Sequence, residues 1–202
     1  MVIRMNIILA AGSPRRRELL KMIVENFEVI VSDCEEKITK SSPSEVTKEL
    51  STQKAEAVVC EIQAGKSGFF SDDFLVIGAD TVVSVEGKIL GKPSDKENAR
   101  EMISDLSGRS HEVYTGVTLC HVQGSKCRKV SFAVDTKVYV AKMSEEEIEE
   151  YISTKEPYDK AGGYGIQGLF GKFVEKIDGD YNNVVGLPVQ RLYREMKELL
   201  GL

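Results

Sequence analysis

The chain has 202 residues, of which 42% are hydrophobic and 29% charged, so it can bury a sizeable core as one large α/β domain or two small ones. Its net charge of −5 argues against a general nucleic-acid or membrane surface, and no apolar segment is long enough for a membrane span or a signal peptide. Four cysteines without a CxxC spacing and two histidines without a Ser or Cys motif beside them support neither a zinc site, a disulfide framework nor a catalytic triad, and we expect reduced thiols in the cytoplasm.

A strand, a tight turn and a helix are predicted at the start of the chain. Residues 6–10 form a short apolar run typical of a buried strand, and residues 11–13 are small enough for a turn. Ser13 is a suitable N-cap and Pro14 suits the first helical position, so we expect a helix over residues 14–24. Because the first N–H groups of such a helix point outward at its positive dipole end, this turn is a candidate anion site.

Arg15, Arg16 and Arg17 occupy the first turn of that helix. Cations there oppose the helix dipole by about 0.3–1 kcal/mol each, and acidic residues are the usual choice. Two interpretations stay open from these residues alone: a solvated basic turn, or a site that a bound anion normally neutralises.

The next predicted helix carries a lysine on its apolar side. A strand at 27–31 and an acidic segment at 33–36 precede this helix, which a capping box beginning at Ser42 places over residues 43–62. Lys54 lies in the middle of the apolar stripe. Either its stem packs while the ammonium reaches water, or the ammonium points into a cleft.

A continuous apolar run at 74–79 predicts a central strand buried on both faces, which we expect to stop at Asp80 and Thr81. Open α/β sheets place their ligands at the carboxyl ends of strands, so Asp80 stands where a ligand is expected. Residues 82–90 then predict a hairpin, which Lys92 follows.

The remaining chain predicts helices and strands without an obvious linker, so we expect one domain over residues 1–202 whose β-rich middle forms one lobe of a cleft. Long glycine-rich loops in compact domains are often functional, which draws attention to residues 156–171. The elements predicted here are a helix at 94–106 capped by Ser94, strands at 111–121 and 127–140, a helix at 144–153 capped by Ser144, the glycine-rich loop, a strand at 173–177 and a helix at 188–200.

Several charged residues stand in unexpected places, and together they suit a polyphosphate with a bound divalent cation. Arginine and lysine offset phosphate charge, while carboxylates hold Mg²⁺ and orient or deprotonate an attacking water. Without a covalent-nucleophile arrangement, direct in-line attack by water is the simpler route to hydrolysis. These residues are Arg15, Arg16, Glu35, Glu36, Lys54, Asp80 and Lys92.

The sequence also resembles the Maf family of nucleoside triphosphate pyrophosphatases, in the inosine-triphosphatase-like superfamily. That resemblance implies a mixed α/β (α+β) fold with an elongated central mixed sheet flanked by helices and two lobes around a cleft. It spans nearly the whole chain, in the segments at 9–16, 35–36, 54–55, 78–83, 91–93, 106–111, 160–168 and 183–188.

The resemblance implies hydrolysis of a nucleoside triphosphate to the monophosphate and pyrophosphate with Mg²⁺ or Mn²⁺, and the Gln167 loop resembles the dTTP- and UTP-specific branch. A glutamine side chain has a donor and an acceptor, which suits the O4/N3–H edge of thymine or uracil. The implied proton acceptor is Asp80, the metal-binding carboxylates are Glu36 and Asp80, the phosphate-facing residues are Ser13, Arg15, Arg16, Lys54 and Lys92, and the base-selecting residues are Arg15, Thr81 and Gln167.

One position departs from the family pattern, because Ala11 stands where a serine is usual. Ser13 and the backbone must then supply the hydrogen bonds of that turn. The change also resembles the LAAGxGxR opening of nucleotidyltransferases, although Pro14 replaces its second glycine. A further alternative is a non-catalytic nucleotide-binding regulator of cell division. The nucleotide is the expected partner, without nucleic acid or membrane, and the family is often a homodimer.

Overall fold

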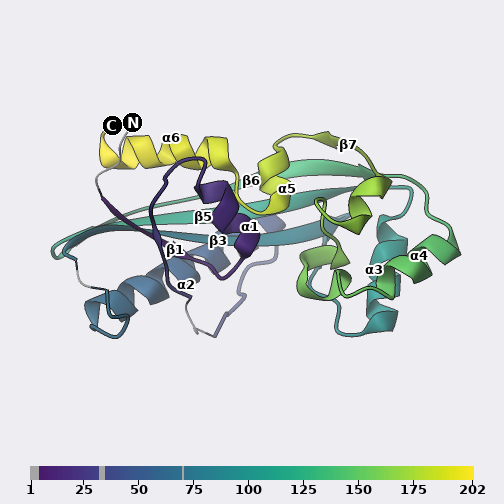
Figure 1. Ribbon diagram of the computed structural model, residues 1–202, viewed down its shortest axis with the longest axis horizontal. Helices are drawn as coiled ribbons and strands as arrows, with labels where there is room; N and C mark the ends of the chain where they lie inside the picture. Colours follow the sequence, from purple (N-terminus) through teal and green to yellow (C-terminus); the bar gives the residue numbers. More distant parts are fainter. Residues whose placement is uncertain (1–4, 32–34, 70) are drawn as a thin grey trace. The chain divides into compact units, whose positions relative to one another are not determined.

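The computed structural model describes residues 5–31, 35–69 and 71–202, so part of the predicted acidic segment, including Asp33 and Cys34, lies outside the described residues. Figure 1 shows helices set around long strands. The elements are β1 (Asn6–Ala10), α1 (Pro14–Leu20), β2 (Glu28–Val29), α2 (Pro43–Gln63), β3 (Asp73–Val85), β4 (Lys88–Leu90), α3 (Lys96–Leu106), β5 (Ser110–Gln123), β6 (Lys126–Val140), α4 (Glu145–Ile152), the 3-10 turns η1 (Pro157–Asp159), η2 (Ala161–Gly163) and η3 (Leu169–Phe173), β7 (Val174–Asp178), α5 (Tyr181–Val185) and α6 (Val189–Leu200).

These strands form a seven-stranded mixed sheet in the order β2-β1-β3-β5-β6-β7, with β4 paired to β3. The chain therefore has the mixed α/β fold that was predicted. Its contacts group into two compact units: the first holds the described residues up to Asp80, Thr115–Val134 and Gly186–Leu202, and the second holds Thr81–Tyr114 and Asp135–Val185. Because β3, β5 and β6 contribute residues to both, neither unit is a continuous stretch of chain, and a single domain stays a prediction.

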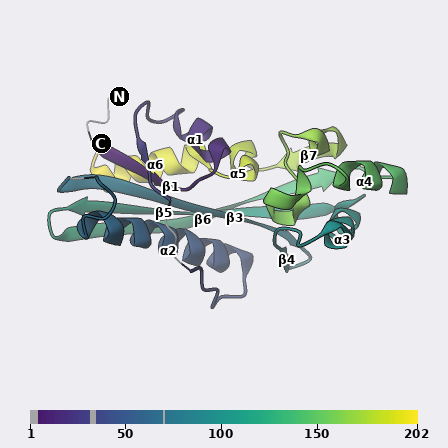
Figure 2. The same cartoon turned by 60° about the horizontal axis from the view of Figure 1, so that its bottom comes forward.

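The first unit is layered, with α2 on one face of its strands and α1 and α6 on the other (Figure 2). Within it β1 pairs in parallel with β2 and with β3. One apolar cluster includes Ile8 of β1, Val58 of α2, and Phe74 and Val76 of β3, each with 1% or less of its surface exposed. Alternate residues of a strand share a face, so Asp80 of β3 lies on the same face as Phe74 and Val76.

The second unit has its own apolar core, in which α3 packs against α4. Here β3 turns through Glu86 and Gly87 into β4, and β6 pairs antiparallel with β7. Positive φ angles at Glu86 and Gly87 fit the tight hairpin that the sequence predicted. No helix in the described ranges is long and apolar enough to cross a membrane.

Helix caps were the most reliable local signal. The side chains of Ser13 and Ser42 accept N–H groups of the first turns of α1 and α2, and Ser144 forms a complete capping box with Glu147. The predicted cap of α3, Ser94, was wrong by one residue. The N-cap is Asp95, whose carboxylate accepts the Asn98 N–H at 2.9 Å.

Three other expectations need correction. The central strand was expected to stop at Asp80 and Thr81, but β3 continues to Val85 because the apolar β-branched residues beyond Thr81 pair with β4. The first helix ends at Leu20, four residues earlier than expected. The strand expected at 27–31 is shorter, because β2 covers only Glu28–Val29.

Candidate active site

The turn after β1 lies beside the middle of β3. Ala10, the last residue of β1, is paired with Gly78 of β3, and the two strands run parallel. Beyond these positions the chain leaves β1 through a turn that ends at Ser13, the N-cap of α1, while β3 continues to Asp80. The start of α1 and the Asp80 carboxylate are therefore placed together, as the parallel pairing of two strands requires.

Two glycines allow α2 to approach the sheet closely. A Cβ at Gly78 would lie 2.3 Å from the Ser51 carbonyl oxygen, and a Cβ at Gly116 of β5 would lie 2.3 Å from the Thr47 carbonyl. Since neither neighbour is a flexible side chain, only glycine fits at either position while α2 stays in place. Lys54 lies about one helical turn beyond Ser51 and so extends over the part of β3 that carries Asp80.

The Lys54 ammonium joins two carboxylates. Its Nζ donates to Asp80 Oδ1 and forms an ion pair with Glu36 Oε1 at 3.0 Å. The side chains of Lys54 and Asp80 are 20% and 14% exposed, whereas that of Glu36 is 45% exposed. The Lys54 ammonium is therefore paired with two carboxylates, and its position in a cleft stays a prediction.

Arg16 belongs to the same charged group. Its half-buried side chain donates from Nε to the Gly186 carbonyl at 2.9 Å, which ties the start of α1 to the segment before α6. Burial lowers the pKa of the Arg16 guanidinium, the Asp80 carboxylate opposes that shift, Arg15 adds to it and Glu36 opposes it. An arginine stays charged in proteins, so two cations and two carboxylates share one site.

The other predicted residues of this turn have local roles. The Ser13 hydroxyl accepts the Arg16 N–H at 3.4 Å, and Arg15 is half-buried beside Arg16. Ala11 is only 6% exposed and contributes a methyl group to the core. The sequence departure at position 11 therefore leaves the turn packed, with Ser13 as its hydroxyl.

Thr81, Lys92 and Gln167 belong to the second unit. Thr81 follows Asp80 in β3 and is half-buried, whereas Lys92 and Gln167 are exposed. Next to Lys92, the Gly91 carbonyl accepts the Gly162 N–H at 2.9 Å. The lysine segment and the glycine-rich segment, predicted separately, thus lie side by side.

Sequence reasoning missed one residue of the second unit, Glu156. Its carboxylate accepts the backbone N–H of Leu169 at 2.8 Å and holds the loop that carries Gln167. The available signal was an acidic residue at the start of a glycine-rich stretch, which by itself does not distinguish an anchor from a solvated charge.

The carboxylates of Glu36 and Asp80 are suitable ligands for a magnesium ion. Both reach the same ammonium, so both face one position where positive charge is stabilised. No cluster of three or more His, Cys, Asp or Glu side chains suited to a metal occurs in the described part of the chain. Mg²⁺ does not need one, because it usually keeps several waters and binds through one or two carboxylates plus substrate phosphates.

Known proteins are similar to this chain over nearly its whole length. A sequence model of the family described as Maf-like protein matches residues 6–199. Proteins named dTTP/UTP pyrophosphatase are similar: one from Carboxydothermus hydrogenoformans is 52% identical over 96% of this chain and 98% of its own, and one from Agathobacter rectalis is 50% identical over 96% and 97%. The solved Staphylococcus aureus Ham1 protein aligns over 67% of this chain and 72% of its own, with 15% identity and a TM-score of 0.40. By its match from residue 6 to residue 199, this chain belongs to the Maf-like protein family.

Proposed function

We propose that this protein hydrolyses dTTP and UTP to the nucleoside monophosphate and pyrophosphate, and so acts on the nucleotide pool in a house-cleaning role. The observation that carries the proposal is the charged group of the first unit, in which Lys54 forms ion pairs with Asp80 and Glu36 near Arg16. Relatives that are about half identical over almost all of their length bear the name of this activity.

The cations of this group bind the triphosphate. Arg16 offers a planar set of donors and Lys54 a compact charge, and both kinds of side chain are suited to phosphate oxygens. Arg15 and the Ser13 hydroxyl lie in the same turn at the start of α1, where backbone N–H groups also favour an anion. Lys92 is a further phosphate-facing cation that the family resemblance implies.

Hydrolysis proceeds by attack of water on the α-phosphorus. The water oxygen forms a bond to that phosphorus while the bond from phosphorus to the α–β bridging oxygen breaks, and pyrophosphate leaves. Asp80 accepts the proton that the water loses, and Lys54 orients the Asp80 carboxylate through their ion pair. The positive charge of Arg16 and Lys54 offsets the charge that develops on the phosphoryl oxygens.

Glu36 and Asp80 are the residues that would hold a divalent cation, Mg²⁺ or Mn²⁺. Such an ion supplies charge neutralisation and orientation of the phosphate oxygens when it is bound. Gln167 and Thr81 select the base, with the Gln167 amide offering one donor and one acceptor to a pyrimidine. Arg15 is a further base-selecting residue that the family resemblance implies.

The experiment that tests this proposal is a panel of nucleoside triphosphates with separate readouts for pyrophosphate and phosphate. We expect pyrophosphate from dTTP and UTP in the presence of Mg²⁺. Release of phosphate alone overturns the proposal, and so does an absolute need for a sugar phosphate as second substrate, which would mark a nucleotidyltransferase. Binding without any product would mark a non-catalytic regulator.

The chain acts as a single catalytic domain of residues 1–202 in the cytoplasm, where its nucleotide substrates occur. The interleaving of its two units supports the single domain, because cutting the chain between them would sever β3, β5 and β6. Light scattering on the purified protein tests the homodimer that the family resemblance implies.

A further inference from the structure

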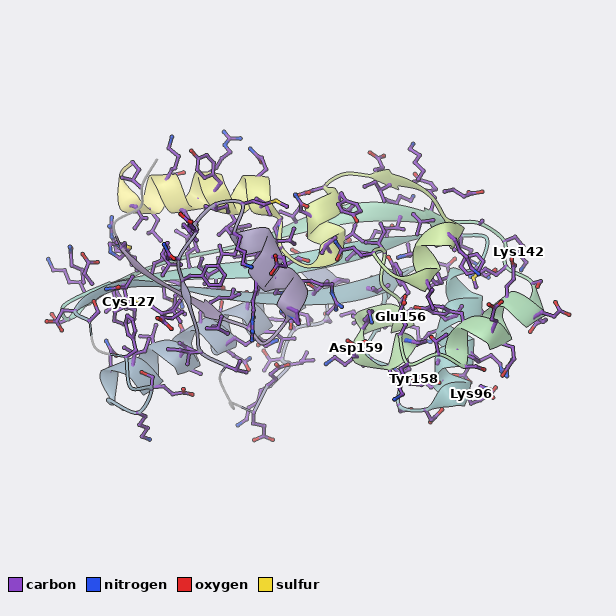
Figure 3. All side chains as sticks on the ribbon, in the orientation of Figure 1. Lys96, Cys127, Lys142, Glu156, Tyr158 and Asp159 are labelled. Carbon is purple, nitrogen blue, oxygen red and sulfur yellow. The ribbon has the colours of Figure 1, made fainter. Side chains whose placement is uncertain are left out.

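The loop that carries Gln167 is held by hydrogen bonds to one carboxylate. Glu156 lies just after α4, and its Oε2 accepts the Leu169 N–H at 2.8 Å while its Oε1 accepts the Phe170 N–H at 3.4 Å. Oε1 also accepts from the Tyr151 hydroxyl, at 3.1 Å. Figure 3 labels Glu156 in the second unit, close to Tyr158 and Asp159 of η1.

The backbone of Glu156 is also fixed. Its N–H donates to the Thr154 hydroxyl at 3.2 Å, and its carbonyl accepts from the Lys160 ammonium at 2.8 Å. Lys160 is additionally paired with Asp159 at 2.6 Å. A glutamate whose backbone and carboxylate are both bonded has little freedom to move, so it is a firm attachment for the loop.

Gly168, directly after Gln167, is packed against this carboxylate. A Cβ at position 168 would lie 2.3 Å from both Glu156 oxygens, so any side chain there would have to displace the carboxylate. At the other end of the loop, a Cβ at Gly165 would lie 2.8 Å from Cε of Lys160. The Lys160 and Glu156 side chains thus pack closely against Gly165 and Gly168, and Gln167 is exposed between these two glycines.

We infer that Glu156 is a positioning residue for nucleobase selection: it fixes the backbone that directly follows Gln167, so that this amide meets the base in one orientation. The inference rests on the proposed function, in which Gln167 reads the base edge. A side-chain amide discriminates between bases only when its donor and acceptor are held in place, because a mobile one adapts to several hydrogen-bond patterns.

The first test compares Glu156→Ala with the wild-type protein on dTTP, UTP and GTP. We expect kcat/KM for dTTP and UTP to fall about tenfold, as for loss of a hydrogen bond to a charged group, mainly through KM. The kcat/KM for GTP should change much less, so the ratio of kcat/KM for dTTP and UTP to that for GTP should fall. Glu156→Gln keeps one acceptor oxygen and should recover part of the preference. The control is Glu150→Ala, which removes an exposed carboxylate from α4, the helix that precedes Glu156.

A second test leaves Glu156 in place and disturbs it from the opposite side. Gly168 has an extended backbone that alanine tolerates, so the damage in Gly168→Ala should come from the collision with the carboxylate. Combining Gly168→Ala with Glu156→Ala removes that collision, and the double variant should be less impaired than the sum of the single changes predicts.

Amide hydrogen exchange gives a readout that does not depend on activity. In Glu156→Ala the Leu169 and Phe170 amides should lose protection while the α4 amides keep theirs. Equal loss of kcat/KM on every nucleotide, or unchanged protection at Leu169 and Phe170, overturns the inference while the proposed function stands. A wild-type protein that releases no pyrophosphate from any nucleotide overturns both.

Discussion

Gly78 of β3 lies directly against the Ser51 carbonyl oxygen of α2, at a distance that leaves no room for a Cβ. This contact sets how closely the helix approaches the sheet in the first unit. Lys54 lies three residues after Ser51 in α2, and Asp80 lies two residues after Gly78 in β3. The same contact therefore also sets the distance between the Lys54 ammonium and the Asp80 carboxylate. A backbone contact without chemical function of its own thus determines the geometry of the charged group.

Replacing that glycine should weaken both stability and catalysis. In Gly78→Ala the methyl group meets backbone, which cannot rotate away, so we expect a loss of about 1–3 kcal/mol of unfolding free energy, as for other overpacked sites. Turnover should fall as well, because Lys54 moves away from Asp80. Urea denaturation and pyrophosphate release measure the two effects. For stability, Gly91→Ala is the control, since a Cβ there meets no atom within 4 Å.

Asp80→Asn should separate binding from turnover. The amide keeps the shape of the side chain but cannot accept the proton from water, so we expect kcat to fall by about 10²–10⁴-fold, the usual contribution of general acid–base catalysis. Nucleotide binding, measured by calorimetry, should remain. Asp72→Asn is the matched control, because Asp72 is an exposed carboxylate of the same unit. Unchanged turnover would remove Asp80 as the proton acceptor.

Gln167→Glu should alter base preference. The carboxylate has no donor, so it cannot serve a base edge that offers a carbonyl oxygen, and kcat/KM for dTTP and UTP should fall about tenfold or more. The kcat/KM for guanine nucleotides, which present N–H groups, should rise relative to that for dTTP and UTP. The nucleotide panel provides the measurement, with Gln190→Glu on the exposed surface of α6 as control. An identical nucleotide profile would contradict the assignment of Gln167.

Removing divalent metal should stop turnover without unfolding the protein. Lys54 pairs with both Glu36 and Asp80, so their mutual repulsion is already offset by a side chain of the protein. We expect a chelator to abolish pyrophosphate release, Mg²⁺ or Mn²⁺ to restore it, and the melting temperature to change little. Full activity in excess chelator would exclude the metal-binding role of the two carboxylates.

Stability should depend on pH through His111. Burial lowers the pKa of this imidazole from 6.5 to about 4, and its Nδ1 has no hydrogen-bond partner among the described residues. The unfolded chain therefore binds the proton more readily than the folded one. The free energy of unfolding is highest above pH 6.5 and falls as the pH drops toward 4. A pKa shift of this size corresponds to a loss of about 3 kcal/mol in the free energy of unfolding.

Denaturation at several pH values between 7 and 4 measures the effect, which should be smaller in His111→Gln. Tyr164→Phe removes the hydroxyl that lies 2.7 Å from His111 Nε2 but leaves the ring buried, so its pH dependence should match that of the wild type. If His111→Gln retains the full pH dependence, another group is responsible.

Most of the local structure and the candidate residues could be predicted from the amino-acid sequence alone. Caps at Ser13, Ser42 and Ser144 were recognisable because a cap and the N–H that it accepts are only three residues apart. The family resemblance was also readable, since the segments that carry it are continuous in the chain. Even so, the end of the central strand was missed, because pairing with β4 decides whether β3 continues past Asp80.

Which of those residues lie together depends on how the helices and strands pack. Arg16, Glu36, Lys54 and Asp80 come from separate parts of the chain, and the parallel pairing of β1 with β3 and the close approach of α2 bring them into one charged group. The anchoring role of Glu156 likewise depends on residues thirteen and fourteen positions away. Contacts over such separations are set by packing of whole elements, which local propensity and spacing do not specify.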